Sequence, residues 1–450
     1  MNSVDRPSTR LNVIRSFGGF ATRKGGFLAN VLVLFSWAVV AQGITIAVVP
    51  LLTRLYHPEQ FGVYSLFTNV AVLLAVVGAL RYEFAIVLPT EDRDARSLVL
   101  LGLILAATAA AVTLMLGTAI GVLVRHSPKV GQLRPWLGWL AAAVFLSAVY
   151  SILMYWSLRQ KAFASLAISR VVIAAAMAAV QLLTALWFGP YTALLIVAMV
   201  IGQASGVAFL VWRTKFRFNR DVTVVEIRAI AKRYISFPKY SAVGSLLDAL
   251  SSLLPIAMLT ILFSPRIAGL YAIADKVART PAVLFGSSLQ QVFYQRLAES
   301  RADPGACKAL LVRTWRYLLA IGILPMAIIF ATGPHLFGFV FGQQWIESGF
   351  FARILSVGLL VHFVAYPTTN GIVAFERLGV MLAWQALYVT SLIAVFGVGG
   401  FVLHLSPRAI LWLFAGSQVL VQLVNLAAQW KVLEDHMGGP QAPSAQAALP

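Results

Sequence analysis

The feature that most constrains this chain is a series of long apolar stretches that recurs along almost its whole length. An α-helix needs about 20 apolar residues to cross a bilayer, because each residue advances the helix by only about 1.5 Å. Twelve such segments lie near residues 27–52, 60–80, 98–124, 136–158, 166–188, 191–212, 240–262, 267–295, 317–341, 351–374, 380–403 and 409–430. We therefore expect an all-α polytopic membrane protein with twelve transmembrane helices.

The composition excludes the main soluble classes. Charged residues make up 11% of the chain and hydrophobic residues 60%. An ordinary soluble domain carries about 25% charged residues, so this chain could not cover a water-facing surface. The single cysteine, Cys307, excludes a disulfide framework and a Cys-rich zinc site.

The basic residues predict the orientation in the membrane. The chain has 35 Lys and Arg against 16 Asp and Glu. No basic-aromatic module accompanies this excess, so we expect no nucleic-acid partner. With a cytoplasmic N-terminus, 25 of the cations lie in inner segments and 6 in outer ones. Because cytoplasmic segments are enriched in Lys and Arg, this distribution predicts that both termini are cytoplasmic.

A short motif occurs twice. Residues 58–64 read PEQFGVY and residues 265–271 read PRIAGLY, so Pro, Gly and Tyr recur at a constant offset of 207 residues. Both copies open helices of the same predicted orientation, which indicates a parallel repeat of six spans and two pseudo-symmetric six-helix lobes. Such lobes with a cleft between them are typical of an alternating-access transporter. The alternative is an ancestral duplication that was retained only for packing.

The repeat divides the chain into five parts. These are a basic cytoplasmic N-terminus (1–26), an N-lobe (27–212), a basic cytoplasmic linker (213–239), a C-lobe (240–430) and a disordered cytoplasmic tail (431–450). The tail is expected to be disordered because its end is rich in Pro, Ala and Gln.

Charged residues within the predicted spans are the candidate functional residues. Each costs roughly 2.5–3.5 kcal/mol at bilayer depth, so each needs a reason to be there. Asp275, Lys276 and Arg279 share one helix face, because they are three or four residues apart. Asp248 lies in the preceding span, and Arg81 with Glu83 ends the second.

Two interpretations of these charges remain open. In one, Asp275 and Asp248 neutralise the two cations of the later helix in a structural network. In the other, Lys276 and Arg279 face a hydrated cleft and bind an anionic substrate, while the aspartates moderate the field. Arg81 with Glu83 has a simple structural alternative as an interfacial ion pair.

No catalytic motif is present. The chain lacks the phosphate-binding loop of ATPases, the His-Glu-x-x-His zinc motif and any Ser/His/Asp constellation. We therefore expect no enzymatic activity, no cofactor and no metal site.

Several segments resemble the oligosaccharide flippase and polysaccharide-export proteins of the multidrug/oligosaccharidyl-lipid/polysaccharide superfamily. The segments that carry the resemblance are PLLTRLY (50–56), PEQFGVY (58–64), LRYEFAIVLP (80–89), PKYS (238–241), AGLY (268–271) with Asp275, and VFYQRL (292–297). The Arg-Tyr-Glu run that begins at Arg81 is the more specific of these motifs. The resemblance extends over about 27–430.

The resemblance implies a V-shaped pair of six-helix lobes that opens alternately to each side of a bacterial inner membrane. It implies a substrate of sugars joined through phosphate or pyrophosphate to a polyprenol, moved to the outer leaflet for O-antigen lipopolysaccharide, capsule or exopolysaccharide assembly. Membrane lipids are expected partners, and a polysaccharide polymerase and chain-length proteins are candidates. The family's cationic cavity is carried over only to Arg81, Lys276 and Arg279, with Asp275 and Asp248 beside them.

Other functions remain possible from the sequence. A cation-coupled multidrug antiporter of the same superfamily would have a cavity dominated by acids, whereas bases outnumber acids in these spans. A membrane glycosyltransferase or polymerase would need a large outer domain, and the longest predicted outer loop is 125–135. A scaffold in a polysaccharide-assembly complex is a third possibility.

Overall fold

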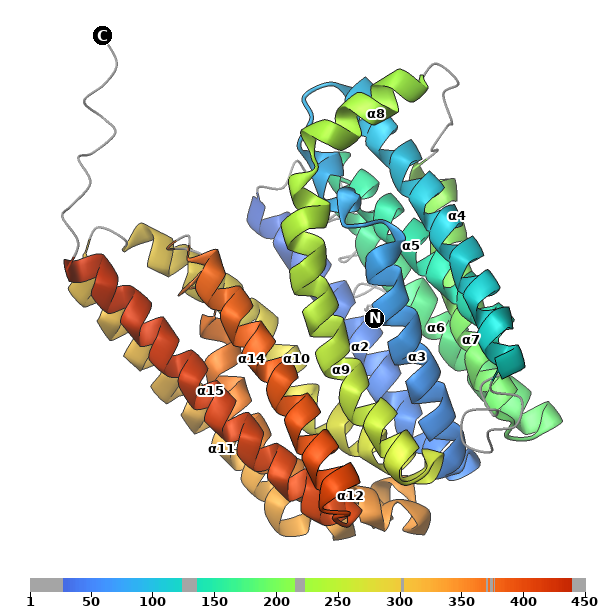
Figure 1. The fold of residues 1–450 in the computed structure, drawn as a ribbon, viewed down its shortest axis with the longest axis vertical. Helices are drawn as coiled ribbons and strands as arrows, with labels where there is room; N and C mark the ends of the chain where they lie inside the picture. The colour runs from blue at the N-terminus through green and yellow to red at the C-terminus, as the bar shows by residue number, and fades with distance from the viewer. Residues whose placement is uncertain are drawn as a thin grey trace, which may run out of the picture.

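The computed structural model describes residues 27–123, 136–214, 223–300, 303–369, 371–372, 375 and 377–438. Long helices dominate these residues, and no strand occurs among them. Figure 1 shows the arrangement of the helices.

The helices follow one another with short connections. They are α2 (Phe27–Leu55), α3 (Pro58–Gly78), α4 (Asp92–Leu123), α5 (Leu137–Arg159), α6 (Phe163–Phe188), α7 (Thr192–Thr214), α8 (Val224–Arg233), α9 (Ala242–Leu262), α10 (Pro265–Glu299), α11 (Pro304–Phe341), α12 (Ile346–Ala365), α14 (Leu378–Phe396) and α15 (Pro407–Gly438). Short helical turns are η1 (Tyr82–Val87), η3 (Phe237–Ser241), η4 (Gln343–Trp345), η5 (Tyr366–Thr368) and η6 (Gly397–Val402).

Within the described residues, ten helical segments are long and apolar enough to cross a membrane. This confirms the predicted all-helical, multi-pass membrane class, while the expected number of twelve spans remains a prediction. Two long helices, α2 and α10, are not among the ten. The side chains of α2 are described only from its middle onward, and α10 carries the charges at Asp275, Lys276 and Arg279.

The helices form two arms that diverge toward the end of the molecule bearing α8 (Figure 1). Helices α11, α14 and α15 belong to one arm and α3 to α7 to the other. Helix α9 contacts both α3 and α14, and α10 packs along α3. The largest buried cluster draws residues from both halves of the chain, including Tyr56, Phe61, Trp345 and Phe414.

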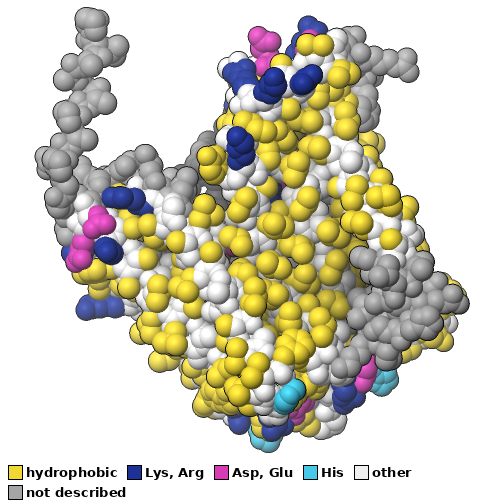
Figure 2. Space-filling model, viewed as in Figure 1, with side chains coloured by type: hydrophobic (Ala, Val, Ile, Leu, Met, Phe, Trp, Pro, Cys, Tyr) yellow, Lys and Arg dark blue, Asp and Glu magenta, His cyan; other side chains and the backbone are white. Residues whose placement is uncertain are grey.

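The surface of the arms is apolar, as expected of helices in lipid. Figure 2 shows hydrophobic side chains over the middle of the molecule and Lys and Arg side chains toward its ends. Large exposed side chains include Leu186, Trp187 and Phe339. A helix in lipid satisfies all its backbone hydrogen bonds internally, so apolar side chains on the outside are compatible with a stable fold.

The predicted linker and the start of the predicted tail both contain helical residues. Within the linker 213–239, α8 is a helix that begins with a capping box, in which the Glu226 amide donates to the Thr223 hydroxyl. Helix α15 continues to Gly438, so residues 431–438 are helical rather than disordered. These residues pack on α11, where Val432 and Leu433 share a buried cluster with Cys307 and Leu311, and Lys308 pairs with Glu434 at 3.2 Å. Residues 1–26, the whole of the loop 125–135 and residues 439–450 lie outside the described part of the chain.

Candidate functional site

The two copies of the repeated motif touch where α3 and α10 cross. A Cβ atom on Gly62 would overlap the carbonyl group of Pro265, and one on Gly269 would overlap that of Pro58. Each glycine therefore lies against the first residue of the opposite motif. Only glycine permits so close an approach of two backbones. The sequence indicated the repeat but not this contact between its copies.

Polar contacts surround this crossing and join the two halves of the chain. Glu59 accepts a hydrogen bond from Arg266 at 3.1 Å, and these residues occupy equivalent positions in the two motifs. The Thr53 carbonyl accepts from Trp345 Nε1 at 2.7 Å and from Gln344 Nε2 at 2.9 Å. The arms are therefore held together at the end of the molecule where α3 and α10 begin.

A cavity of about 680 Å³, here named the central cavity, lies beside the crossing. It is bounded by α2 and α3 from the first half of the chain and by α9, α10 and α11 from the second. Its charged and polar lining residues are Gln42, Tyr64, Ser65, Thr68, Asn69, Ser251, Ser252, Tyr271, Asp275, Lys276, Arg279 and Thr280. Two cations and one carboxylate give this lining a net positive charge.

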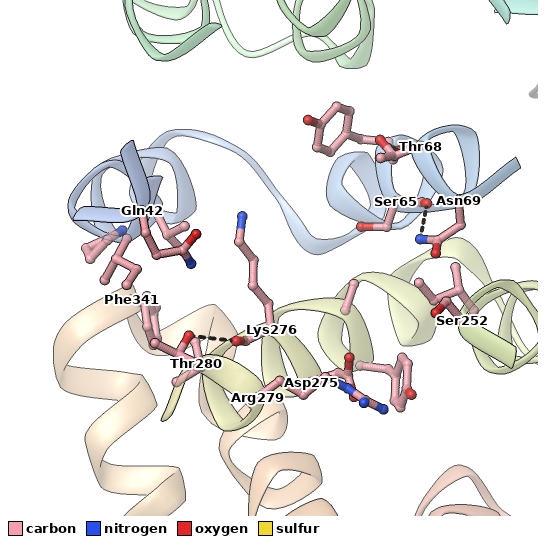
Figure 3. Close-up of a pocket in the computed structure, with 18 of the residues that line it drawn as sticks. Gln42, Ser65, Thr68, Asn69, Ser252, Asp275, Lys276, Arg279, Thr280 and Phe341 are labelled. Atoms are coloured by element: carbon pink, nitrogen blue, oxygen red, sulfur yellow. Dashed lines mark hydrogen bonds and ion pairs between the residues drawn. The ribbon is translucent and has the colours of Figure 1, made fainter. Parts of the chain in front are cut away.

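Lys276 extends into the central cavity between α2 and α3 (Figure 3). Its side chain is exposed, and no carboxylate of a described residue pairs with it. The structural network in which the aspartates neutralise both cations is therefore incomplete. Lys276 presents an ammonium group that can bind an anion.

Arg279 is already paired. Its Nε donates to Asp275 Oδ1 at 2.7 Å across one helical turn, and both side chains are partly exposed. The hydroxyls of Tyr271 and Tyr388 lie close to the same guanidinium group. Arg279 is thus held in place by Asp275, which also offsets part of its charge.

The opposite wall of the central cavity is polar but uncharged. The repeat offset relates Asp275 to Thr68 and Lys276 to Asn69, so equivalent positions carry ions in one half and neutral groups in the other. Thr68 and Asn69 donate hydrogen bonds to backbone carbonyls of their own helix. Sequence reasoning missed these residues, although polar side chains at positions 65, 68 and 69 of an apolar helix share one face.

Asp248 lies in a second cavity. Its Oδ1 accepts a hydrogen bond from Gln385 Nε2 at 2.9 Å, and neither Lys276 nor Arg279 forms an ion pair with it. This second cavity has a volume of about 570 Å³ and lies among α9, α10, α12, α14 and α15. Arg279 lines both cavities.

Arg81 lies away from the lining of both cavities. It adopts a left-handed backbone conformation with φ of 62°, its Nη1 lies 3.4 Å from Glu83 Oε1, and its guanidinium group covers the ring of Phe84. Burial raises the pKa of Glu83, and the positive charge of Arg81 opposes that shift. These contacts favour the structural interpretation of Arg81.

A row of buried amides on α15 was not foreseen. Gln418, Gln422, Asn425 and Gln429 are each at most 3% exposed. Their hydrogen bonds reach neighbouring helices, for example from Gln422 Nε2 to His362 Nδ1 at 2.9 Å. Spacings of three and four residues in an otherwise apolar span would have revealed this polar stripe.

Comparison with known proteins identifies the family. The family model described as polysaccharide biosynthesis protein matches residues 51–349. The comparison with curated proteins gives no significant match.

Solved structures identify the fold. An inward-facing multidrug resistance MATE family transporter of the MOP superfamily is 16% identical, with 90% of this chain and 95% of that chain covered and a TM-score of 0.68. An outward-facing structure of such a transporter is 13% identical, with 93% and 98% covered and a TM-score of 0.58. A MATE transporter from Vibrio cholerae is 13% identical, with 90% and 94% covered and a TM-score of 0.54.

The family match includes both copies of the repeated motif, the crossing of α3 and α10, and the charged face of α10. The structural matches extend over almost all of the chain and give it the MATE-like fold. The chain therefore belongs to the polysaccharide biosynthesis protein family.

Proposed function

We propose that this chain is a flippase that carries polyprenyl-(pyro)phosphate-linked oligosaccharide from the cytoplasmic to the outer leaflet by alternating access. It would act in a bacterial inner membrane as two six-helix lobes with both termini in the cytoplasm, and would supply O-antigen, capsule or exopolysaccharide assembly. The observation that carries the proposal is Lys276, which projects into the central cavity and forms no ion pair with a carboxylate of the described residues.

The cavity provides a polar path for the headgroup. A phosphate or pyrophosphate group cannot cross hydrocarbon unaided, whereas a hydrated cavity with net positive charge attracts it. At 4 Å and an effective dielectric constant near 20, one cation-phosphate pair is worth about 4 kcal/mol before desolvation. The polyprenyl tail stays in the bilayer beside the gap between the arms.

The partial neutralisation of Arg279 assists release. Two free cations would hold a pyrophosphate tightly and slow its departure. Asp275 competes with the substrate for Arg279 at 2.7 Å, so the substrate meets one free cation and one shared cation. The site can therefore capture the headgroup and still release it.

The contacts near the crossing indicate which side is closed. Glu59, Arg266, Gln344 and Trp345 join the halves at the end that the basic residues predict to be outer. The better match to the inward-facing transporter, with a TM-score of 0.68 against 0.58, agrees with a conformation open to the cytoplasm. We infer that this conformation is the substrate-loading state of the protein.

The membrane potential can drive the export step. A headgroup with two negative charges that moves outward across about 100 mV, inside negative, gains roughly 4.6 kcal/mol. Coupling to protons or sodium ions is an additional energy source compatible with the fold.

The test is translocation of lipid-linked sugar by protein reconstituted in vesicles. Lys276→Gln should lower the rate at least tenfold because it removes the free cation, and Lys276→Arg should retain much of it. Lys232→Gln is the matched control, because Lys232 is exposed on α8 outside both cavities. An unchanged rate for correctly inserted Lys276→Gln would remove this residue from the mechanism.

A multidrug antiporter is the second candidate, because the structural neighbours are described as multidrug resistance transporters. Such a protein would accumulate a cationic aromatic dye in inverted vesicles. The net positive lining of the central cavity argues against a cationic substrate. Dye transport without translocation of lipid-linked sugar would favour the antiporter.

A further inference from the structure

The second cavity has the chemistry of a site for neutral, polyhydroxylated groups. Among the described residues that line it, the charged ones are Asp248 and Arg279, whose formal charges cancel. Its volume of about 570 Å³ lies within the range of roughly 300–1,000 Å³ that is usual for small-molecule sites. A cavity without net charge does not select phosphate, so it requires another ligand.

Amide and hydroxyl groups dominate its polar lining. Gln290 makes no hydrogen bond to any described residue, so its amide can both donate and accept. Gln385 donates to Asp248, but its buried Oε1 accepts no hydrogen bond from the described residues. The hydroxyls of Ser251 and Ser252 donate to the backbone of Asp248 and keep their lone pairs available. Sugar hydroxyls can donate and accept in the same way.

Flat aromatic rings occur in the same lining. Trp384 and Tyr388 stack with ring centroids 6.1 Å apart and an interplanar angle of 16°. His362 and Tyr366 stack at 5.3 Å and 28°. The negatively polarised face of an aromatic ring attracts the C–H bonds on the face of a pyranose. A polyprenyl tail would not need the amides, and a phosphate would not need the rings.

The second cavity adjoins the central cavity. Arg279, Ser251 and Ser252 line both of them. A phosphate bound at Lys276 and Arg279 would therefore lie next to the entrance of the second cavity. The sugar attached to that phosphate could enter it without moving the phosphate.

We propose that the second cavity is a glycan subsite, in which amides, hydroxyls and the Trp384 and Tyr388 rings bind the sugars nearest the phosphate. This inference rests on the proposed function, since it assigns the sugar part of the same substrate. It gives the C-terminal half of the chain a role in selecting which lipid-linked glycan is carried.

The experiment compares two probes on the purified full-length protein in lipid nanodiscs. One is polyprenyl pyrophosphate without sugar, and the other is the same carrier with the glycan from membranes of the producing strain. The wild type should bind the glycosylated probe at least tenfold more tightly. Gln290→Leu and Trp384→Phe should each reduce that preference severalfold and leave the affinity for the sugar-free probe unchanged.

Two control variants separate the outcomes. Trp412→Phe changes an exposed tryptophan of α15 outside both cavities and should have no effect. Lys276→Gln should weaken the binding of both probes. Equal wild-type affinity for the two probes, or unchanged preference in both Gln290→Leu and Trp384→Phe, would overturn the glycan subsite alone. Binding of neither probe by the wild type would overturn the proposed function, and with it the subsite.

Discussion

Two cations three residues apart on one helix face have different surroundings. Lys276 has no acidic partner among the described residues, whereas Arg279 is paired with Asp275 across one turn. Their shared face could be predicted from the sequence, because helical geometry alone determines it. Which of them is neutralised depends on rotamers and on neighbouring tyrosines, which no local pattern specifies.

This difference predicts that substitutions of the two cations affect stability to different extents. Arg279→Gln leaves the Asp275 carboxylate without its partner and should lower the free energy of unfolding by about 1–3 kcal/mol. Lys276→Gln should change it little, since the Lys276 side chain is exposed and forms no ion pair with the described residues. Thermal unfolding in detergent measures both.

The matched double variant Asp275→Asn/Arg279→Gln removes both members of the pair. It should be more stable than Arg279→Gln alone, because no carboxylate is left unpaired. A double variant as unstable as the single one would mean that Arg279 stabilises the fold through its other contacts.

At the scale of elements, the crossing of α3 and α10 brings the backbones of the two halves into close contact. Gly62 and Gly269 allow the backbones to meet, and the Glu59–Arg266 pair lies beside them. A side chain at either glycine must separate the helices. Because this crossing is near the predicted outer end, separation should favour a conformation that opens outward.

Gly62→Ala should therefore increase exposure of the central cavity to the outside. The measurement uses Thr68→Cys in a Cys307→Ala background and an impermeant maleimide added externally. Labelling should become severalfold faster with Gly62→Ala. Gly43→Ala is the matched control, because a Cβ there meets no atom within 4 Å and alanine favours the helix. Equal acceleration by the control would show a general effect of alanine.

At the scale of the whole molecule, alternating access requires the arms to separate where they now meet. Glu59 and Arg266 approach to 3.1 Å there although they are 207 residues apart in the chain. A covalent link between these positions should hold the outer end closed. The loading state would then still bind its substrate but could not release it outward.

We expect Glu59→Cys/Arg266→Cys, joined by a short bifunctional reagent in a Cys307→Ala background, to stop translocation. Binding of lipid-linked sugar from the cytoplasmic side should persist. The two single-cysteine variants treated with the same reagent are the controls. Translocation at the full rate by completely cross-linked protein would contradict opening at this end.

The sequence by itself determined the helical membrane class, the repeat and the shared face of Asp275, Lys276 and Arg279. Each depends on local information, because a helix in lipid satisfies its backbone within itself and needs only a long apolar segment. The capping box of Thr223 and Glu226 is also a local signal, and it could have predicted the helix in the linker. The basic residues of that segment indicated only a cytoplasmic linker.

Only the tertiary structure decided which polar groups share a cavity. Thr68 and Lys276 line one cavity, Asp248 pairs with Gln385 rather than with a cation, and Gln422 contacts His362. These partners belong to helices far apart in the chain. Their meeting depends on the depth, rotation and crossing of packed helices, and no window of sequence contains that information. The physical reason is that helix formation is local, whereas the composition of a cavity is set by the packing of the whole bundle.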